Sequence, residues 1–215
     1  MAVRASRSGR PKDAAKRAAI IAAARGLFAD HAFDLVTMEA VAARADVSKM
    51  TVYSHFHDKE TLFETVVSSI SDQMMRDLSE PERERGGLRE RLTAIGCSFL
   101  RLILGSEICR MAHTLPAALR GNQVLARRFY AAGPGRVRAA LAAMIAAAAS
   151  RGELTVDDAD WAASDLVSLW ENGLPALLAF GLMEPVTSAE IERRARRGTE
   201  VFLRAYGTKG NGVTS

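Results

Sequence analysis

Polar side chains of the kind that hydrogen-bond a large partner are concentrated between residues 48 and 55. They fall opposite the apolar Val52 and Phe56 in a short helical pattern, and they are Ser48, Lys49, Thr51, Tyr53, Ser54 and His55. Such groups suit a nucleic-acid duplex, where a lysine donates to guanine and a threonine methyl contacts thymine. The pattern therefore predicts a nucleic-acid interface on this face.

Two short helices must hold this face in place. Apolar residues recur at helical spacing just before it, namely Met38, Val41, Ala42 and Ala45. Helices this short are not stable alone, so we expect them to pack on each other and on a first helix over residues 13–31. Thr37 and Ser48 are the expected N-caps, and Asp58 is expected to cap a long fourth helix. The predicted arrangement is a helix-turn-helix, whose second helix enters the major groove.

Candidate roles follow from position along this motif. Lys49 and Thr51 lie where base edges are reached, and Met50 either contacts bases or crowds the groove. Residues farther along the helix, and those at helix N-termini with free N–H groups, are better placed for phosphates. The full predicted DNA-binding set is Arg10, Thr37, Arg44, Ser48, Lys49, Met50, Thr51, Tyr53, His55 and Lys59.

Positive charge is concentrated at the start of the chain. The first 25 residues carry seven lysines and arginines against one acidic residue, Asp13, whereas the whole chain has a formal net charge of +4. This excess suits an anionic polymer, although a solvated tail would have the same composition. We expect residues 1–12 to form a disordered basic arm. Its Gly9-Arg10-Pro11 tripeptide is like that of minor-groove AT-hooks, so an extended Arg10 is a candidate for a narrow A·T groove.

The segment from residue 20 to residue 63 resembles the DNA-binding region of the TetR family of bacterial regulators. The matching residues are Phe28, Phe33, Thr37, Val41, Ala42, Ala45, Val47, Ser48, Thr51, Tyr53, Phe56, Lys59 and Leu62. The resemblance implies a three-helix head, a long connecting helix, and a body that binds ligand and dimerises. The chain departs from the family pattern at Ala32 and Asp46, where glycine is usual, and at Met50. A left-handed backbone is common at the turn position of Asp46, and Asp tolerates it better than most residues do.

The whole chain is predicted to be all-α. Apolar residues make up 48% of its 215 residues, and aromatic residues only 6%. We predict an N-terminal three-helix helix-turn-helix domain at residues 13–60 and a larger C-terminal helical domain, for effector binding and dimerisation, at residues 61–210. Helices are expected at 88–104, at 107–119 with a break near Pro116, at 122–151 with an interruption at Gly133-Pro134-Gly135, at 157–181 with a bend near Asn172, and at 188–206.

A homodimer is expected from the last two helices. The resemblance implies that they form a four-helix bundle with those of a second copy. The candidate seams are Leu166, Leu169, Gly173 and Leu177 in one helix and Ile191, Ala195, Gly198, Phe202 and Ala205 in the other. The same pattern would also serve as a core face within one subunit. We favour the dimer, because a two-fold protein matches a palindromic operator.

A ligand pocket is predicted in the body. The candidate lining residues are Met74, Phe99, Ile103, Met111, His113, Tyr130, Met144, Trp161, Trp170 and Asn172. An apolar lining with a few polar groups suits a small organic effector, although the apolar residues among these candidates are also ordinary core residues. The stretch FYAAGPGRVRAAL, residues 129–141, resembles a C-terminal subtype found in regulators of the AefR kind.

Other classes of protein fit less well. The sequence has no glycine-rich phosphate loop, nucleophile motif or paired-carboxylate pattern, so neither an enzyme nor a cofactor is predicted. His55 and His57 would point to different faces of a helix, which argues against a metal site. The two cysteines fit a reducing cytoplasm, and the most apolar stretches are shorter than the ~20 residues that a bilayer span needs.

We therefore expect a cytoplasmic DNA-binding transcriptional regulator, a repressor that a small organic effector releases from a palindromic operator. The alternative is an architectural or accessory DNA-binding protein that responds to no effector. Such a protein would share the helix-turn-helix but would need no pocket.

Overall fold

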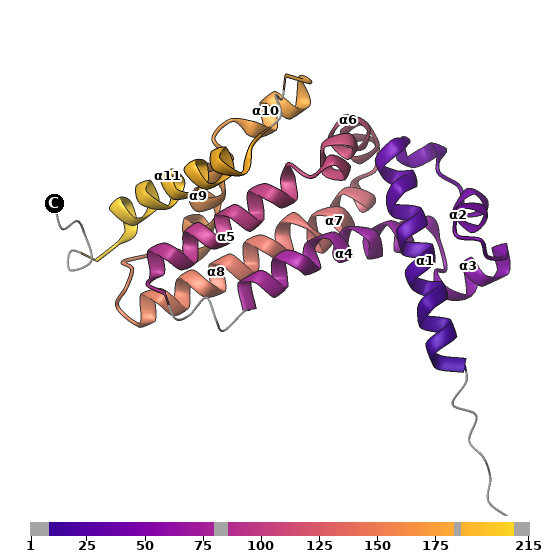
Figure 1. The fold of residues 1–215 in the computed structure, drawn as a ribbon, viewed down its shortest axis with the longest axis horizontal. Coiled ribbons are helices and arrows are strands. Elements are labelled where there is room, and N and C mark those ends of the chain that lie inside the picture. The colour runs from indigo at the N-terminus through magenta and orange to yellow at the C-terminus, as the bar shows by residue number, and fades with distance from the viewer. Residues whose placement is uncertain (1–8, 80–85, 183–185, 209–215) are drawn as a thin grey trace, which may run out of the picture.

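The protein is elongated, with a small helical head at one end of a larger helical body (Figure 1). The computed structural model describes residues 9–79, 86–182 and 186–208. Within these ranges the chain folds into helices, with one isolated bridge between Leu154 and Gly207. The predicted all-α class, with a head and a body, is confirmed. None of the helices in these ranges has the length and apolarity needed to cross a membrane.

The head contains α1 (Gly9–Asp30), the 3-10 turn η1 (Phe33–Leu35), α2 (Met38–Arg44) and α3 (Lys49–His55). Both predicted N-caps are present. The Thr37 hydroxyl accepts a hydrogen bond from the Ala40 N–H, and the Ser48 hydroxyl accepts one from the Thr51 N–H, each at 3.1 Å. Each cap satisfies one unpaired N–H at the start of a short helix. Between the two helices, Asp46 has a φ of 53°, the left-handed conformation expected for this turn.

Three phenylalanines lie at the centre of the head core. The ring centroids of Phe28, Phe33 and Phe63 are 5.0–5.7 Å apart, a range in which aromatic rings attract one another. Val52 of α3 is fully buried in the same cluster. Burial of Val52 turns the opposite, polar side of α3 outward.

Helix α4 (Lys59–Ser79) crosses from the head into the body. Leu62 and Phe63 near its start belong to the head core, whereas Met74 near its end belongs to the body core. As predicted, Asp58 caps the helix by accepting a hydrogen bond from the Thr61 N–H at 2.7 Å. The boundary predicted after residue 60 therefore falls within the first turn of a continuous helix.

The body continues with α5 (Leu88–Ile103), α6 (Ser106–Gly121), α7 (Gln123–Ala132), α8 (Pro134–Ser150), α9 (Ala159–Glu171), α10 (Leu174–Ala179) and α11 (Ser188–Tyr206). Trp170 lies in the second core, fully buried, and its indole N–H donates to the Thr199 hydroxyl at 3.2 Å. A methyl group added to Gly96 or Gly198 would come within 2.7–2.8 Å of the Trp170 ring. Glycine at these two positions leaves the space that the indole occupies.

The predicted interruptions of the later helices are confirmed. Gly133 separates α7 from α8, which has a proline in its first turn. Helix α9 ends where Asn172 and Gly173 take positive φ values of 40° and 86°. The chain therefore turns just before the α10 helix that contains Pro175, because a proline fits the first turn of a helix and destabilises a helix interior.

Two expectations about helix limits are wrong. Helix α6 is not broken near Pro116 but runs through it, with Pro116 exposed. A proline inside a helix costs stability, but it can kink a helix without ending it. Helix α1 begins at Gly9 rather than at residue 13, so the last four residues of the predicted disordered arm are helical. Pro11 falls in the first turn, where N–H groups have no helical partner.

Most residues of the predicted dimer seams are buried in the core of a single protomer. Helix α11 packs along α5 and α9, which buries Leu166, Ile191, Ala195, Gly198 and Phe202. The alternative of an intramolecular core face therefore holds for these five residues, and the prediction of an intersubunit seam through them is wrong. Leu169 is half-buried against Gly198, whereas Gly173, Leu177 and Ala205 are exposed.

Candidate DNA interface and effector cavity

The outward face of α3 carries the side chains predicted to reach bases. Met50 is the most exposed large apolar residue of this helix, with 77% of its surface accessible, and Tyr53 is also exposed. The Thr51 and Ser48 hydroxyls are 2.9 Å apart. The cap that starts the helix therefore also fixes Thr51, at the end of α3 that enters the groove in a helix-turn-helix.

Lys49 is held by an ion pair in the unbound protein. Its ammonium contacts the carboxylate of Glu39 in α2 and lies 5.7 Å from the centroid of the Tyr53 ring. The hydrogen bond with Glu39 raises the pKa of Lys49, and the same bond lowers the pKa of Glu39. Both side chains are more than half exposed, so a base or phosphate can replace Glu39 as the partner of Lys49 at little cost.

Two predicted phosphate ligands face the protein instead. The His55 side chain is only 10% exposed, and its Nε2 lies 3.2 Å from a carboxylate oxygen of Asp13 in α1. The Lys59 ammonium donates to the Phe33 carbonyl at 2.9 Å and lies 4.4 Å from the centroid of the Phe33 ring. The expectation that these two side chains project toward DNA is wrong, because each one joins elements of the head.

The other predicted contacts have mixed positions. Thr37 is exposed at the N-terminus of α2. Arg44 is exposed but lies across α1, where a methyl group on Gly26 would be 2.9 Å from its guanidinium. Arg10 is in the first turn of α1, which is helical rather than extended, and its side chain lies outside the described residues.

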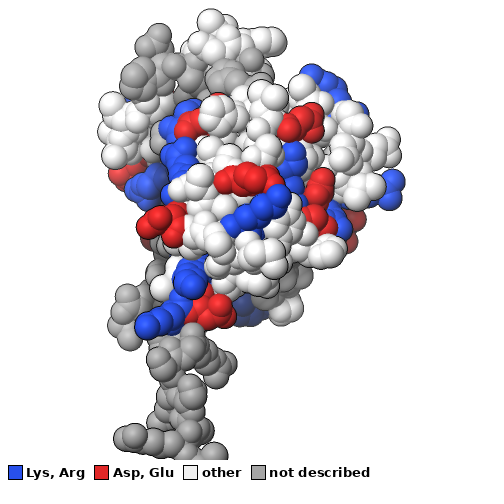
Figure 2. All heavy atoms as spheres, turned by 90° about the vertical axis from the view of Figure 1, so that its right-hand side faces the viewer, with Lys and Arg blue, Asp and Glu red and all other residues white. Residues whose placement is uncertain are grey.

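The head end of the molecule has a mixed charge. Figure 2 shows lysine and arginine side chains interspersed with acidic and uncharged ones over this face. Of the seven cations among the first 25 residues, Arg4 and Arg7 lie outside the described residues. The described surface is therefore not a continuous cationic patch.

Among the residues that the structure describes, two ion pairs join the head to the body. The Arg25 guanidinium contacts Glu107, and the Arg110 guanidinium lies 2.9 Å from a carboxylate oxygen of Asp30. Arg25 and Asp30 belong to α1, whereas Glu107 and Arg110 belong to α6. Helices α1 and α6 are consequently tied at two points along their contact.

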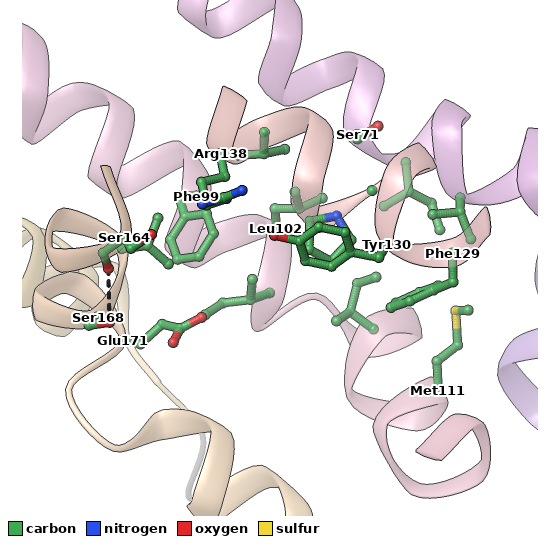
Figure 3. Close-up of a pocket in the computed structure, with 18 residues that line it drawn as sticks. Ser71, Phe99, Leu102, Met111, Phe129, Tyr130, Arg138, Ser164, Ser168 and Glu171 are labelled. Atoms are coloured by element: carbon green, nitrogen blue, oxygen red, sulfur yellow. Dashed lines mark hydrogen bonds between the residues drawn. The ribbon is translucent and has the colours of Figure 1, made fainter. Parts of the chain in front are cut away.

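Beside this contact the body has a partly open cavity of about 380 Å³. Six helices, α4 to α9, contribute to its wall. The lining residues are Val67, Ile70, Ser71, Phe99, Leu102, Ile103, Ile108, Met111, Phe129, Tyr130, Gly133, Pro134, Val137, Arg138, Ser164, Val167, Ser168 and Glu171 (Figure 3). The size and the mainly apolar lining suit a small organic molecule.

The cavity has a polar end and an apolar end. Figure 3 shows Arg138, Ser164, Ser168 and Glu171 toward one side, with Phe129 and Met111 at the other. The two serine hydroxyls there donate to carbonyl oxygens of α9 at 2.9 Å.

Ser71 lies on the α4 wall but serves the fold. Its hydroxyl donates to the Ala132 carbonyl at 3.0 Å, and it accepts from Arg136 at 3.3 Å. Arg136 also pairs with Asp72 at 2.6 Å. These contacts fasten α4 to the junction of α7 and α8.

Four of the ten predicted pocket residues line this cavity, namely Phe99, Ile103, Met111 and Tyr130. The prediction is wrong for five others. Met74, Met144 and Trp170 are buried in the body core, Trp161 is 71% exposed, and Asn172 is the exposed C-cap of α9. The side chain of His113 lies outside the described residues.

Sequence reasoning missed Arg138 and Glu171, because a charged residue in an amphipathic helix normally indicates a solvated face. The unusual position of Glu171 is detectable only in the fold, where burial raises the pKa of its carboxyl. Phe129 and Tyr130 are neighbours in the stretch that carries the AefR resemblance, and that stretch was the available signal for Phe129.

Comparison with known families and structures agrees with this arrangement. Residues 20–66 match the family model of bacterial regulatory proteins of the tetR family, and residues 90–208 match the AefR-like transcriptional repressor C-terminal domain. The second match alone covers more than half of the chain. The chain therefore belongs to the TetR family of transcriptional regulators, which bind DNA through the helix-turn-helix, and its body is of the AefR-like type.

Solved structures of similar proteins cover nearly the whole chain. A TetR-family regulator from Mesorhizobium loti is 29% identical with a TM-score of 0.79, covering 92% of this chain and 99% of its own. The flavonoid-responsive regulator FrrA is 31% identical with a TM-score of 0.72, covering 90% of this chain and 98% of its own.

A relative matched by sequence is the HTH-type transcriptional regulator YdeS of Bacillus subtilis. It is 36% identical over 70 residues, which are 32% of this chain and only 35% of that protein.

Proposed function

We propose that this regulator is a cytoplasmic repressor that binds a palindromic operator as a homodimer and leaves it when a small organic effector occupies the body cavity. The single observation that carries the proposal is that α4 and α6 both line the cavity and both hold the head. One relative supports the proposal of an organic effector, since FrrA is a flavonoid-responsive regulator.

On the DNA side, the exposed face of α3 is the proposed reader of the major groove. Lys49, Met50 and Thr51 are assigned to base edges, and Tyr53 to the adjacent backbone. The hydroxyls of Thr37 and Ser48 and the side chains of Arg10 and Arg44 are assigned to phosphates. His55 and Lys59 are left out, because their partners lie within the head.

On the effector side, the route from cavity to head is short. Val67 and Ile70 line the cavity one to two turns after Phe63, which is part of the head core in the same helix. Ile108 and Met111 line it from α6, on either side of Arg110, which pairs with Asp30 of α1. A ligand that displaces either helix must therefore move α1 or α4, and with them α3.

The proposed dimer uses apolar residues that the protomer leaves exposed near its last helices. They are Trp161 of α9, Leu177, Phe180 and Leu182 at and after α10, and Val201 of α11. A second copy is the occupant that a two-fold operator requires, and it would cover these exposed side chains. In such a dimer the two α3 helices would lie about 34–36 Å apart, one turn of DNA.

The test uses fluorescence anisotropy with labelled DNA from upstream of the chain's own coding sequence. An organic-solvent extract of a culture of the source bacterium should weaken operator binding about fivefold or more, which corresponds to a typical coupling of 1–3 kcal/mol. Ile103→Trp, which fills the cavity, should bind the same DNA but lose the response. Ala143→Trp, on the exposed side of α8, is the matched control and should respond normally.

Operator binding that is unchanged by every extract and fraction would contradict the proposal and favour an effector-independent DNA-binding protein.

For the dimer, sedimentation velocity should show that Trp161→Glu combined with Phe180→Glu gives monomers. Val124→Glu, at an exposed apolar position on α7, should remain a dimer. Dimers in the double variant would reject the assigned surface.

A further inference from the structure

We propose that the effector is an amphipathic organic anion, whose carboxylate or phenolate oxygen binds Arg138 while its apolar body lies against Phe129 and Met111. This inference rests on the proposed function, in which the cavity is the effector site. It adds the chemical class of the ligand and the residue that selects it.

Arg138 is the cation at the polar end of the cavity. Its Nε is buried and has no hydrogen-bond partner among the described residues. Buried donors are normally paired, so this N–H is available for an acceptor that enters the cavity. Its Nη1 lies 3.8 Å from Asp160, an exposed carboxylate at the limit of ion-pair distance. Asp160 therefore neutralises the guanidinium only weakly.

The other polar groups at this end favour an acceptor over a donor in the ligand. The hydroxyl protons of Ser164 and Ser168 are used within α9. Burial raises the pKa of Glu171, which favours the neutral carboxyl, a hydrogen-bond donor, over a second negative charge. A carboxylate or phenolate at this end can thus accept a hydrogen bond from the Arg138 Nε without facing a strongly charged Glu171.

The opposite end favours a flat apolar body. The Phe129 ring stacks on Phe63 of the head core, with centroids 6.2 Å apart. Tyr130 lies close against Gly135, where a methyl group would be 2.7 Å from its ring. Aromatic walls of this kind match aryl groups in size and polarisability. An aryl ligand seated here reaches the ring that anchors α4 in the head.

The experiment is isothermal titration calorimetry on the full-length protein with three probes of one shape: biphenyl-4-carboxylate, biphenyl-4-carboxamide and 4-phenylbenzylamine. The carboxylate should bind about tenfold tighter than the amide, and the amine should bind most weakly. Arg138→Met should remove the preference for carboxylate and leave amide binding within about twofold. Asp160→Asn, which removes the competing carboxylate, should tighten carboxylate binding. Arg127→Met, at an exposed arginine of α7, is the matched control.

The inference is overturned if the carboxylate fails to bind, if carboxylate and amide bind alike, or if Arg138→Met weakens both equally. DNA release is measured separately by anisotropy. Charge-selective binding without release would reject the proposed function but keep the ligand class. Release by neutral compounds alone would keep the function and reject the anion.

Discussion

The guanidinium of Arg110 lies 2.9 Å from the carboxylate of Asp30, and this pair joins α6 of the body to α1 of the head. Arg110 stands between Ile108 and Met111, which line the cavity. A shift of α6 would therefore act on α1 directly, through this ion pair. The pair is one of the direct links between the proposed effector site and the DNA-binding head, beside the stack of Phe129 on Phe63.

Breaking this pair should affect regulation more than stability. Both side chains are about half exposed, so the coupling energy between Arg110→Gln and Asp30→Asn in a double-mutant cycle of unfolding should be about 0.2–1 kcal/mol. Operator release should need a higher effector concentration in each single variant, because one of the two ion pairs that couple α6 to α1 is then lost. Denaturation and anisotropy titrations of the four proteins check this. An unchanged effector response in the double variant would show that the Arg110–Asp30 pair does not carry the signal.

Lys49 and Lys59 should separate into a recognition residue and a structural one. Lys49→Ala should weaken operator binding by about 1–3 kcal/mol, relax the preference at one base pair, and leave stability unchanged because the side chain is exposed. Lys59→Ala should instead lower the unfolding free energy by about 1–2 kcal/mol through loss of the Phe33 contacts. Binding-site selection and urea denaturation measure the two effects. A fall in the salt slope of DNA binding by Lys59→Ala, with stability unchanged, would restore the phosphate role.

The left-handed backbone of Asp46 makes a prediction about the turn of the helix-turn-helix. Asp46→Val should destabilise the protein by about 1–2 kcal/mol, because a β-branched residue is strained at this φ. Asp46→Gly should stabilise it or leave it unchanged within about 1 kcal/mol, since glycine fits the conformation but loses more entropy on folding. Thermal unfolding of both variants tests the pair. Equal effects of Val and Gly would mean that the aspartate side chain, rather than the backbone, is what matters.

Gly198 should prove to be a core residue rather than an interface residue. A methyl group there would lie 2.8 Å from the Trp170 ring and 3.0 Å from the backbone of Leu169. Gly198→Ala should therefore cost about 1–3 kcal/mol of stability through overpacking while the dimer fraction in sedimentation stays the same. Dissociation of the dimer without loss of stability would return Gly198 to the interface.

The head was predictable because its signals are local. Thr37, Ser48 and Asp58 cap helices through hydrogen bonds from residues three positions later. Both partners of such a bond are close together in the sequence, so the sequence alone predicts it. The turn at Asn172 is similarly local, since Pro175 follows it directly. The helix break predicted near Pro116 is wrong, because the continuity of a helix depends on the surroundings of the proline as well as on its missing N–H.

The tertiary partners were not predictable from spacing. Lys59 and His55 are polar residues in polar stretches, and only the fold shows that Phe33 contacts the first and Asp13 the second. Ile191, Ala195 and Phe202 have the periodicity of an interface and of a core alike, and the position of α5 decides between them. Trp170 and Trp161 lie on the same helix, yet one is buried and the other exposed because they face opposite sides of it.

The presence of α4 in both hydrophobic cores has a consequence for how the molecule melts. A fragment that stops at residue 60 would lack Leu62, Phe63 and Val66, whose side chains are fully buried in the head. Such a fragment would expose this surface to water and should not hold its shape in isolation. Calorimetry of the intact chain should accordingly record head and body unfolding in a single cooperative transition. Limited proteolysis should likewise show no early cleavage that separates the head from the body.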